Sequence, residues 1–169
     1  MSSPPENVVL VRMAEIQVVK STREHPVALK TTLGSCVGII LADRQNEVYG
    51  LAHVMLPEKS PGDQTLGKYA DSAVPAMVSL MGQRAGGPGG KLEAFLVGGA
   101  SMFEAVGMSD IGNRNVQAAH KAVRQLNIPV VFDDTGGNCG RTVLFDCQNG
   151  QLAVKTLKRL ETALKENQG

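Results

Sequence analysis

The feature that most constrains the fold of this chain is the run VGIILA at residues 37–42. Successive side chains of a strand point to opposite faces, and here both sets are apolar, which indicates a strand buried on both faces. The turn-forming stretch DRQN (43–46) follows, and residues 47–56 return as a second strand that ends at Pro57. The chain is therefore expected to hold a hairpin inside a layered domain.

The remaining pattern predicts more strands than helices. Strands are expected at 8–20 (as one or two), 27–32, 92–97 and 128–132, and in a hairpin of 142–145 with 152–155 around the turn dipeptide Asn149-Gly150. Helices are expected at 68–83, at 113–125 and within 156–169, after a disordered start at 1–7. Pro75 should kink the first helix or mark its first turn. We predict one α+β domain over residues 1–169, with mixed or antiparallel sheets covered by two or three helices.

Charge and composition exclude several classes of protein. The 169 residues hold 17 Lys and Arg and 16 Asp and Glu, whereas a nucleic-acid binder needs a basic surplus against phosphate. Aromatic residues, at 4%, are too few for a base-stacking surface. The longest apolar runs are too short to span a bilayer, and the start of the chain lacks the pattern of a secretory signal. We expect a soluble intracellular protein that is not membrane-embedded and binds no nucleic acid.

Three cysteines, Cys36, Cys139 and Cys147, are expected to be free thiols. An odd number in a chain of this size does not suggest a disulfide framework, and no Cys-x-x-Cys pair or neighbouring His marks a zinc site. Cys139 lies in a glycine-rich turn region and Cys147 at a strand end, with no His near either in sequence. Each thiol is then either a packing residue or a nucleophile.

The expected hairpin brings Cys36 close to an imidazole. If Ala42 pairs with Glu47 across a four-residue turn, Cys36 lies directly opposite His53, with Cβ atoms roughly 4.5–5.5 Å apart. A neighbouring His can take the thiol proton, lower the pKa of the thiol and later protonate a leaving amine. A slip of one residue would put the two side chains on opposite faces.

The residues before Cys36 add a second element of such chemistry. Gly34 lets the backbone turn tightly, and amides near a nucleophile, such as that of Ser35, can form an oxyanion hole. A plainer interpretation stays open, in which Cys36 is a small buried hydrophobe on a core strand and His53 a hydrogen-bonded polar neighbour.

Other polar residues have ordinary explanations. His120 is expected on the solvated face of its helix. Asp133 and Asp134 stand before a Gly-Gly turn and are expected to be turn formers, although adjacent acids can also do acid–base work. Asn113 is expected to cap the second helix, and Arg114 beside it is suited to bind an anion.

Six blocks of sequence, in a fixed order, carry a resemblance to a known family. They are TTLGSCV (31–37), AHVMLP (52–57), KYAD (68–71), GGASMF (98–103), IGNRNV (111–116), and DTGG (134–137) followed by GRTV (140–143). One block alone would be a weak signal, but six in order over most of the chain are specific. On these residues the chain resembles the chemoreceptor glutamine deamidase family, CheD, of bacterial and archaeal chemotaxis.

The resemblance implies an α/β/β sandwich and a protein-glutamine deamidase that hydrolyses selected glutamine side chains on the cytoplasmic helices of chemoreceptors. Carried over, Cys36 is the nucleophile, His53 the base and Thr31 the third residue, with Thr32 as the alternative. Backbone amides near Ser35 and Cys36 stabilise the oxyanion. The implied reaction needs neither a metal nor an organic cofactor.

The resemblance also implies a regulatory partner, a CheC-type phosphatase that competes with receptors for one face. Phe103 is placed at that face, with a position in the core as the alternative. Two other functions stay open: a non-catalytic module that docks onto the phosphatase or the receptor, and a generic thiol hydrolase of small amides. Hydrolysis of receptor methyl esters would follow the same acyl-transfer route.

Overall fold

The computed structural model of the protein describes residues 7–87, 89–101 and 110–157. Three of the sequence predictions fall outside these ranges. They are the disordered start, apart from Asn7, the C-terminal helix beyond Leu157, and the surface position of Phe103.

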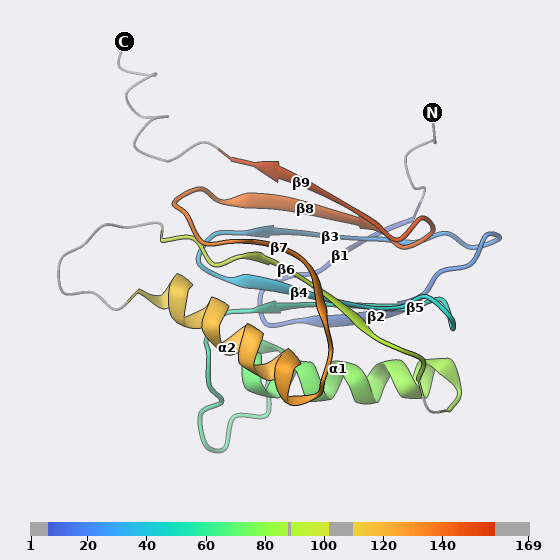
Figure 1. Cartoon of the computed structure of the whole chain (residues 1–169), viewed down its shortest axis with the longest axis horizontal. Coiled ribbons are helices and arrows are strands. Elements are labelled where there is room, and N and C mark those ends of the chain that lie inside the picture. The colour runs from blue at the N-terminus through green and yellow to red at the C-terminus, as the bar shows by residue number, and fades with distance from the viewer. Residues whose placement is uncertain (1–6, 88, 102–109, 158–169) are drawn as a thin grey trace, which may run out of the picture.

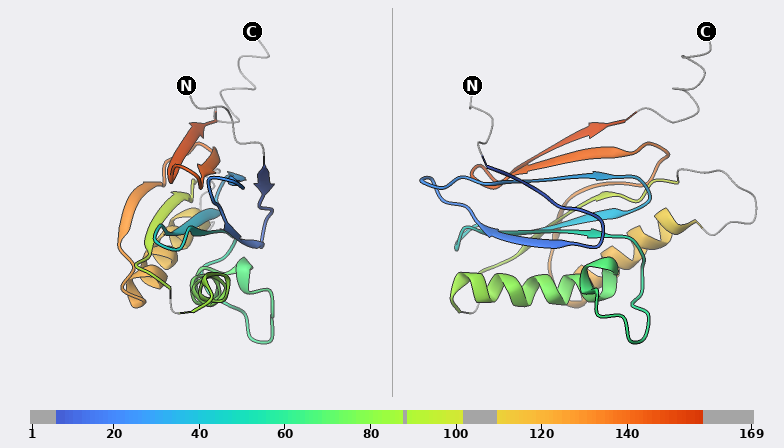
Figure 2. Two further views of the ribbon diagram at one scale, coloured as in Figure 1. Left: turned by 90° about the vertical axis from the view of Figure 1, so that its right-hand side faces the viewer. Right: turned by 180° about the vertical axis from the view of Figure 1, so that it is seen from behind.

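Two sheets and two helices form three layers (Figures 1 and 2). In the described part of the chain, one sheet has the strand order β2-β5-β4-β6-β7 and the other the order β1-β3-β8-β9. Helices α1 and α2 cover the outer face of the five-stranded sheet, and the four-stranded sheet covers its other face. The elements are β1 (Val8–Leu10), β2 (Ile16–Lys20), β3 (Ala28–Leu33), β4 (Val37–Asp43), β5 (Val48–Val54), η1 (Leu66–Lys68), α1 (Ala70–Ala85), β6 (Glu93–Gly98), α2 (Ile111–Gln125), β7 (Val130–Thr135), β8 (Arg141–Asp146) and β9 (Gln151–Thr156). The predicted α+β sandwich is confirmed.

Strand β4 lies in the middle of the five-stranded sheet, and every one of its residues is buried. Ile39 and Leu41 face the helices, in a cluster that includes Met77 of α1 and Val123 of α2. Ile40 faces the second sheet and belongs to a separate apolar cluster between the two sheets. The burial of this strand on both faces, predicted from its sequence, is confirmed.

The register of the β4–β5 hairpin differs by two residues from the expected one. Gly38, rather than Cys36, lies opposite His53, because the turn begins one residue later than predicted. The Asp43 carboxylate accepts hydrogen bonds from the backbone and side-chain nitrogens of Asn46, at 3.1 and 2.8 Å, and so stabilises the later turn. A shift of two leaves each side chain on the same face, so the predicted face of His53 is retained.

Both described α-helices begin at other residues than the sequence predicts. Helix α2 starts at Ile111, because the carboxylate of Asp110 accepts a hydrogen bond from the Asn113 N–H at 3.1 Å. Asp110, not Asn113, is therefore the N-cap, and Asp is one of the residues preferred at this position. Pro75 lies inside α1, beyond the first turn. Neither helix is long and apolar enough to cross a membrane.

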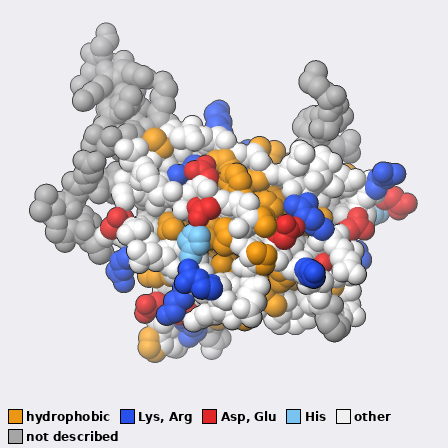
Figure 3. Space-filling view, in the orientation of Figure 1, with side chains coloured by type: hydrophobic (Ala, Val, Ile, Leu, Met, Phe, Trp, Pro, Cys, Tyr) orange, Lys and Arg blue, Asp and Glu red, His pale blue; other side chains and the backbone are white. Residues whose placement is uncertain are grey.

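We expect Leu41→Ala to lower the free energy of unfolding by about 2–5 kcal/mol, because it opens a cavity in a fully buried strand. Val131→Ala is the control. Val131 is 47% exposed on the outer strand β7, where Figure 3 shows apolar side chains at the surface, so its truncation should cost less than about 1 kcal/mol. Urea denaturation measures both changes. Equal losses would contradict the central position of β4.

Candidate active site

The loop of residues 34–36, between β3 and β4, carries Cys36 at one end of the two sheets. The carbonyl groups of all three loop residues accept hydrogen bonds from other parts of the chain. The Gly34 carbonyl accepts from the Ala100 N–H (3.0 Å), that of Ser35 from the Asn115 side-chain amide (3.1 Å), and that of Cys36 from the Gly99 N–H (2.8 Å). The loop is thus held by the segment after β6 and by Asn115 near the start of α2.

Two glycines allow these segments to approach each other. Gly98 has a φ of +103°, and a Cβ atom there would collide with the Cys36 carbonyl oxygen. A Cβ atom on Gly112, in the first turn of α2, would collide with the carbonyl oxygen of Ala100. The blocks GGASMF and IGNRNV therefore supply the close contacts that surround the cysteine loop.

His53 is held by a threonine on the facing sheet. The Thr31 hydroxyl donates to the Val11 carbonyl at 2.7 Å, and its oxygen lies 2.7 Å from His53 Nδ1. Because the single hydroxyl proton is already used, the hydroxyl must accept from an Nδ1–H. Both side chains are buried, at 1% and 4% exposure. This arrangement leaves His53 Nε2 with a free lone pair.

Thr32 points away from this site. Its exposed hydroxyl lies 3.3 Å from that of Thr142 on β8. Alternate residues of β3 face opposite sides, so only one of the two adjacent threonines can contact the imidazole. The structure brings Thr31, and not Thr32, to His53.

Cys36 and His53 share the layer between the two sheets. Cys36 packs against the apolar cluster of this layer, and His53 lies on the face of β5 that contributes Leu51 to the same cluster. Gly38, two residues after Cys36, pairs directly with His53. Cys36, just before β4, is therefore placed diagonally from His53 across the β4–β5 pair rather than directly opposite it.

Burial sets the charge state of this pair. It raises the pKa of the Cys36 thiol, a shift that the Cys36 backbone N–H partly offsets, and it lowers the pKa of His53, with the Val11 backbone acting in the opposite direction. Both shifts favour the neutral forms. The lowering of the thiol pKa by the imidazole, expected from the sequence, is not among the causes of the shift, and desolvation is the largest of them.

The other two cysteines lie in different surroundings. Cys139 is partly exposed, and its thiol lies 3.2 Å from the Asn138 side-chain oxygen. Cys147 is buried, and burial together with the Asp146 carboxylate raises the pKa of its thiol to about 12. The surroundings of Cys147 thus disfavour a thiolate nucleophile.

One prediction about polar residues is wrong and another lacks a contact. His120 is on a partly exposed face of α2, and its Nε2 lies 2.7 Å from a carboxylate oxygen of Asp133. Asp133 and Asp134 are on strand β7 rather than in a turn, and Asp134 pairs with Arg141 at 3.3 Å. These contacts join residues that lie apart in sequence, so local turn propensity did not reveal them.

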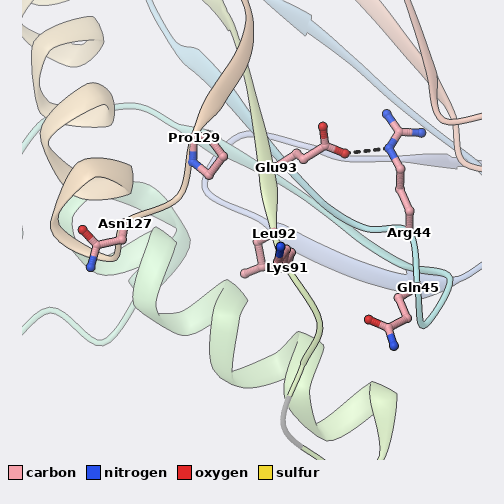
Figure 4. Close-up of a pocket in the computed structure, with 7 residues that line it drawn as sticks. All are labelled: Arg44, Gln45, Lys91, Leu92, Glu93, Asn127 and Pro129. Atoms are coloured by element: carbon pink, nitrogen blue, oxygen red, sulfur yellow. Dashed lines mark hydrogen bonds and ion pairs between the residues drawn. The ribbon is translucent and has the colours of Figure 1, made fainter.

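The described residues also line hollows away from Cys36. A cavity of about 700 Å³ lies near the β4–β5 turn (Figure 4), lined by Arg44, Gln45, Lys91, Leu92, Glu93, Asn127 and Pro129. Arg44 Nε and Glu93 Oε1 are 2.7 Å apart there and satisfy each other's charge. The cavity is at the opposite end of β4 from Cys36, roughly 25 Å along the strand. No three His, Cys, Asp or Glu side chains in the described ranges form a metal-binding group.

The sequence interpretation missed Asn115. Its side chain is fully buried, and its Nδ2 donates to the carbonyls of Ser35 and Met55 at 3.1 and 3.0 Å. The available signal was its spacing: it precedes the buried Ala119 by four residues, so a carboxamide stands on the apolar stripe of α2.

Comparisons with known proteins agree with this arrangement of motifs. A family model described as CheD chemotactic sensory transduction matches residues 55–156. A protein named chemoreceptor glutamine deamidase CheD, from Bacillus licheniformis, is 40% identical over 165 residues, covering 94% of this chain and 95% of its own. Proteins named probable chemoreceptor glutamine deamidase CheD are 45% identical in Geobacillus kaustophilus (88% of this chain, 92% of its own) and 37% identical in Methanococcus maripaludis (92% and 99%). Because the family model covers more than half of the chain and these relatives cover nearly all of it, the chain belongs to the CheD family.

Proposed function

We propose that this protein is a cysteine-dependent deamidase that converts selected glutamine side chains of chemoreceptors to glutamate. Cys36 is the nucleophile, His53 the base, and Thr31 orients the imidazole. The proposal is carried by the buried contact of 2.7 Å between Thr31 Oγ1 and His53 Nδ1, which leaves Nε2 to exchange a proton with a thiol. The names of the relatives supply the substrate class.

The first half-reaction transfers the acyl group to sulfur. As Cys36 Sγ attacks the carboxamide carbon, its proton passes to His53 Nε2, since burial disfavours a thiolate formed in advance. The backbone N–H groups of Ser35 and Cys36 stabilise the negative charge that develops on the amide oxygen. The imidazolium then protonates the nitrogen, the C–N bond breaks, and ammonia leaves a γ-glutamyl thioester.

Water completes the second half-reaction. Neutral His53 takes a proton from water as the oxygen attacks the thioester carbon, and the proton returns to sulfur as the C–S bond breaks. One water is consumed, one ammonia is released, and a neutral Gln becomes a negatively charged Glu. The new charge alters the electrostatics of receptor helix packing and creates a potential methylation site.

The proposal extends to partners and location. The substrate is the cytoplasmic part of a receptor, which assigns the reaction to the cytoplasm. A CheC-type phosphatase as a competing partner stays a prediction, since Phe103 lies outside the described residues. The alternative of a non-catalytic docking module differs in one measurable respect: it binds the receptor without releasing ammonia.

We expect Cys36→Ser to abolish Gln-to-Glu conversion in receptor fragments with little change in Tm, because the hydroxyl is nearly isosteric with the thiol but a much weaker nucleophile. Peptide mass spectrometry measures the conversion. Cys139→Ser is the matched control and should keep the parental rate. Conversion that survives in the first variant and disappears in the second would move the nucleophile, and a parent protein that binds receptor without converting it would favour the docking module.

We expect the acid limb of the pH profile of kcat/KM to lie below the ordinary imidazole pKa of about 6.5. The base must be neutral, an imidazole is neutral above its pKa, and burial lowers the pKa of His53, so activity should persist into weakly acidic solution. Rates from pH 5 to 9 measure the limb. His53→Ala should lower the rate by a factor of about 10²–10⁴. A half-maximal point above pH 7, or a His53→Ala enzyme at parental rate, would contradict this role.

Thr31→Val should lose much of the activity with little change in Tm, because it keeps the branched shape but removes the acceptor that fixes the imidazole. Thr32→Val removes an exposed hydroxyl on the opposite face and should stay near the parental rate. Kinetics of both variants on one receptor fragment make the comparison. If only Thr32→Val is impaired, the third residue is misassigned, and if both are active, the site works as a Cys–His pair.

A further inference from the structure

Asn115 joins the cysteine loop to the end of β5. Its Nδ2 donates one hydrogen bond to the carbonyl of Ser35, the residue before Cys36, and a second to that of Met55, two residues after His53. The orientation of the carboxamide is unambiguous, because a flipped group would direct its oxygen at two carbonyl oxygens. One side chain on α2 thus links the loop that bears the thiol to the strand that bears the imidazole.

The hydrogen bond from Asn115 to the Ser35 carbonyl also determines the direction in which the Cys36 N–H points. In a trans peptide unit the C=O and the N–H point in opposite directions, and the Ser35 carbonyl shares its unit with the Cys36 N–H. Holding the carbonyl toward α2 therefore turns this N–H away from α2. Among the described residues, no backbone or side-chain oxygen accepts from the N–H of Ser35 or Cys36. Burial raises the pKa of the Cys36 thiol, and the Cys36 backbone N–H acts in the opposite direction.

The second polar atom of Asn115 argues against a purely structural role. Its Oδ1 is buried and has no hydrogen-bond partner among the described residues. A buried unpaired oxygen costs free energy, whereas an apolar side chain in this place would carry no such atom. This cost in free energy is explained if the position requires the two N–H donors of the carboxamide.

We propose that Asn115 is a positioning residue of the deamidation site: by holding the Ser35 carbonyl, it aims the Cys36 N–H at the oxyanion that forms on the substrate amide. The inference rests on the proposed function for the identity of that oxyanion. It also has a consequence that needs no substrate. The same N–H favours the Cys36 thiolate. Loss of the hydrogen bond from Asn115 to the Ser35 carbonyl, here called the clamp, should therefore weaken the stabilisation of the thiolate.

The test compares three variants of the full chain. Asn115→Asp puts a carboxylate oxygen where Nδ2 now donates, against two carbonyl oxygens. Asn115→Ala removes the donors and leaves space for water to hydrate both carbonyls, so a folded protein lacking the clamp is available even if the first variant fails to fold. Asn113→Asp makes the same chemical change at an exposed position two residues earlier on α2 and is the control.

Two readouts separate positioning from stability. The first is kcat and KM on one receptor fragment. The second is the rate of Cys36 alkylation by iodoacetamide from pH 6 to 10, in a Cys139→Ser background that removes the other partly exposed thiol. We expect the kcat of both Asn115 variants to fall at least tenfold, approaching the loss of about 10²–10³ that follows removal of one oxyanion-hole donor. Their KM should stay within about twofold of the parental value. Their alkylation profiles should shift to higher pH, and Asn113→Asp should match the parent in both readouts.

Folded Asn115 variants with parental kcat and an unshifted alkylation profile would overturn the inference, and so would a lower Tm as the only change. A different outcome bears on the proposed function alone. If the parent releases no ammonia from receptor fragments, yet the alkylation profile shifts in the Asn115 variants and not in Asn113→Asp, the deamidase proposal fails while the clamp on Cys36 is supported.

Discussion

Burial of β4 on both faces is the constraint on which the other elements depend. A strand with apolar side chains at every position needs a cover on each side, and here two helices supply one and a second sheet the other. Because the second sheet must face β4 and β5, its strand β3 brings Thr31 to the same layer as His53. The contact that orients the imidazole is therefore a consequence of sheet packing.

The same packing explains the charge state of the site. His53 and Cys36 lie at the margin of an apolar layer, where desolvation disfavours both the imidazolium and the thiolate. A site of this kind holds its proton on sulfur until a substrate provides an electrophile and donors stabilise the developing charge. The tautomer of His53 is fixed beforehand, because the Thr31 hydroxyl gives its proton to Val11 and must accept from Nδ1.

The cysteine loop owes its shape to segments that are distant in sequence. Its three carbonyls are held by two backbone N–H groups after β6 and by a carboxamide from α2, and Gly98 and Gly112 allow the close approach. A loop fixed in this way loses little conformational entropy when a substrate binds, which favours a preorganised site over one assembled on binding. The CheD blocks around GGASMF and IGNRNV thus have a common physical role, which is to support the loop that bears Cys36.

The sequence by itself determined the central strand, the two-residue alternation that puts Cys36 and His53 on one layer, and the six blocks that indicate the family. Alternation reports only the face of a side chain, so it survived a register error of two residues. Tertiary structure alone decided the register, the contact of His53 with Thr31 rather than with its neighbour, the His120–Asp133 pair and the contacts of Asn115. Each of these depends on which hydrogen-bonding group a donor meets across the fold, and the Asn115 contact joins residues 80 positions apart. Local patterns of apolar and polar residues carry no information about such partners.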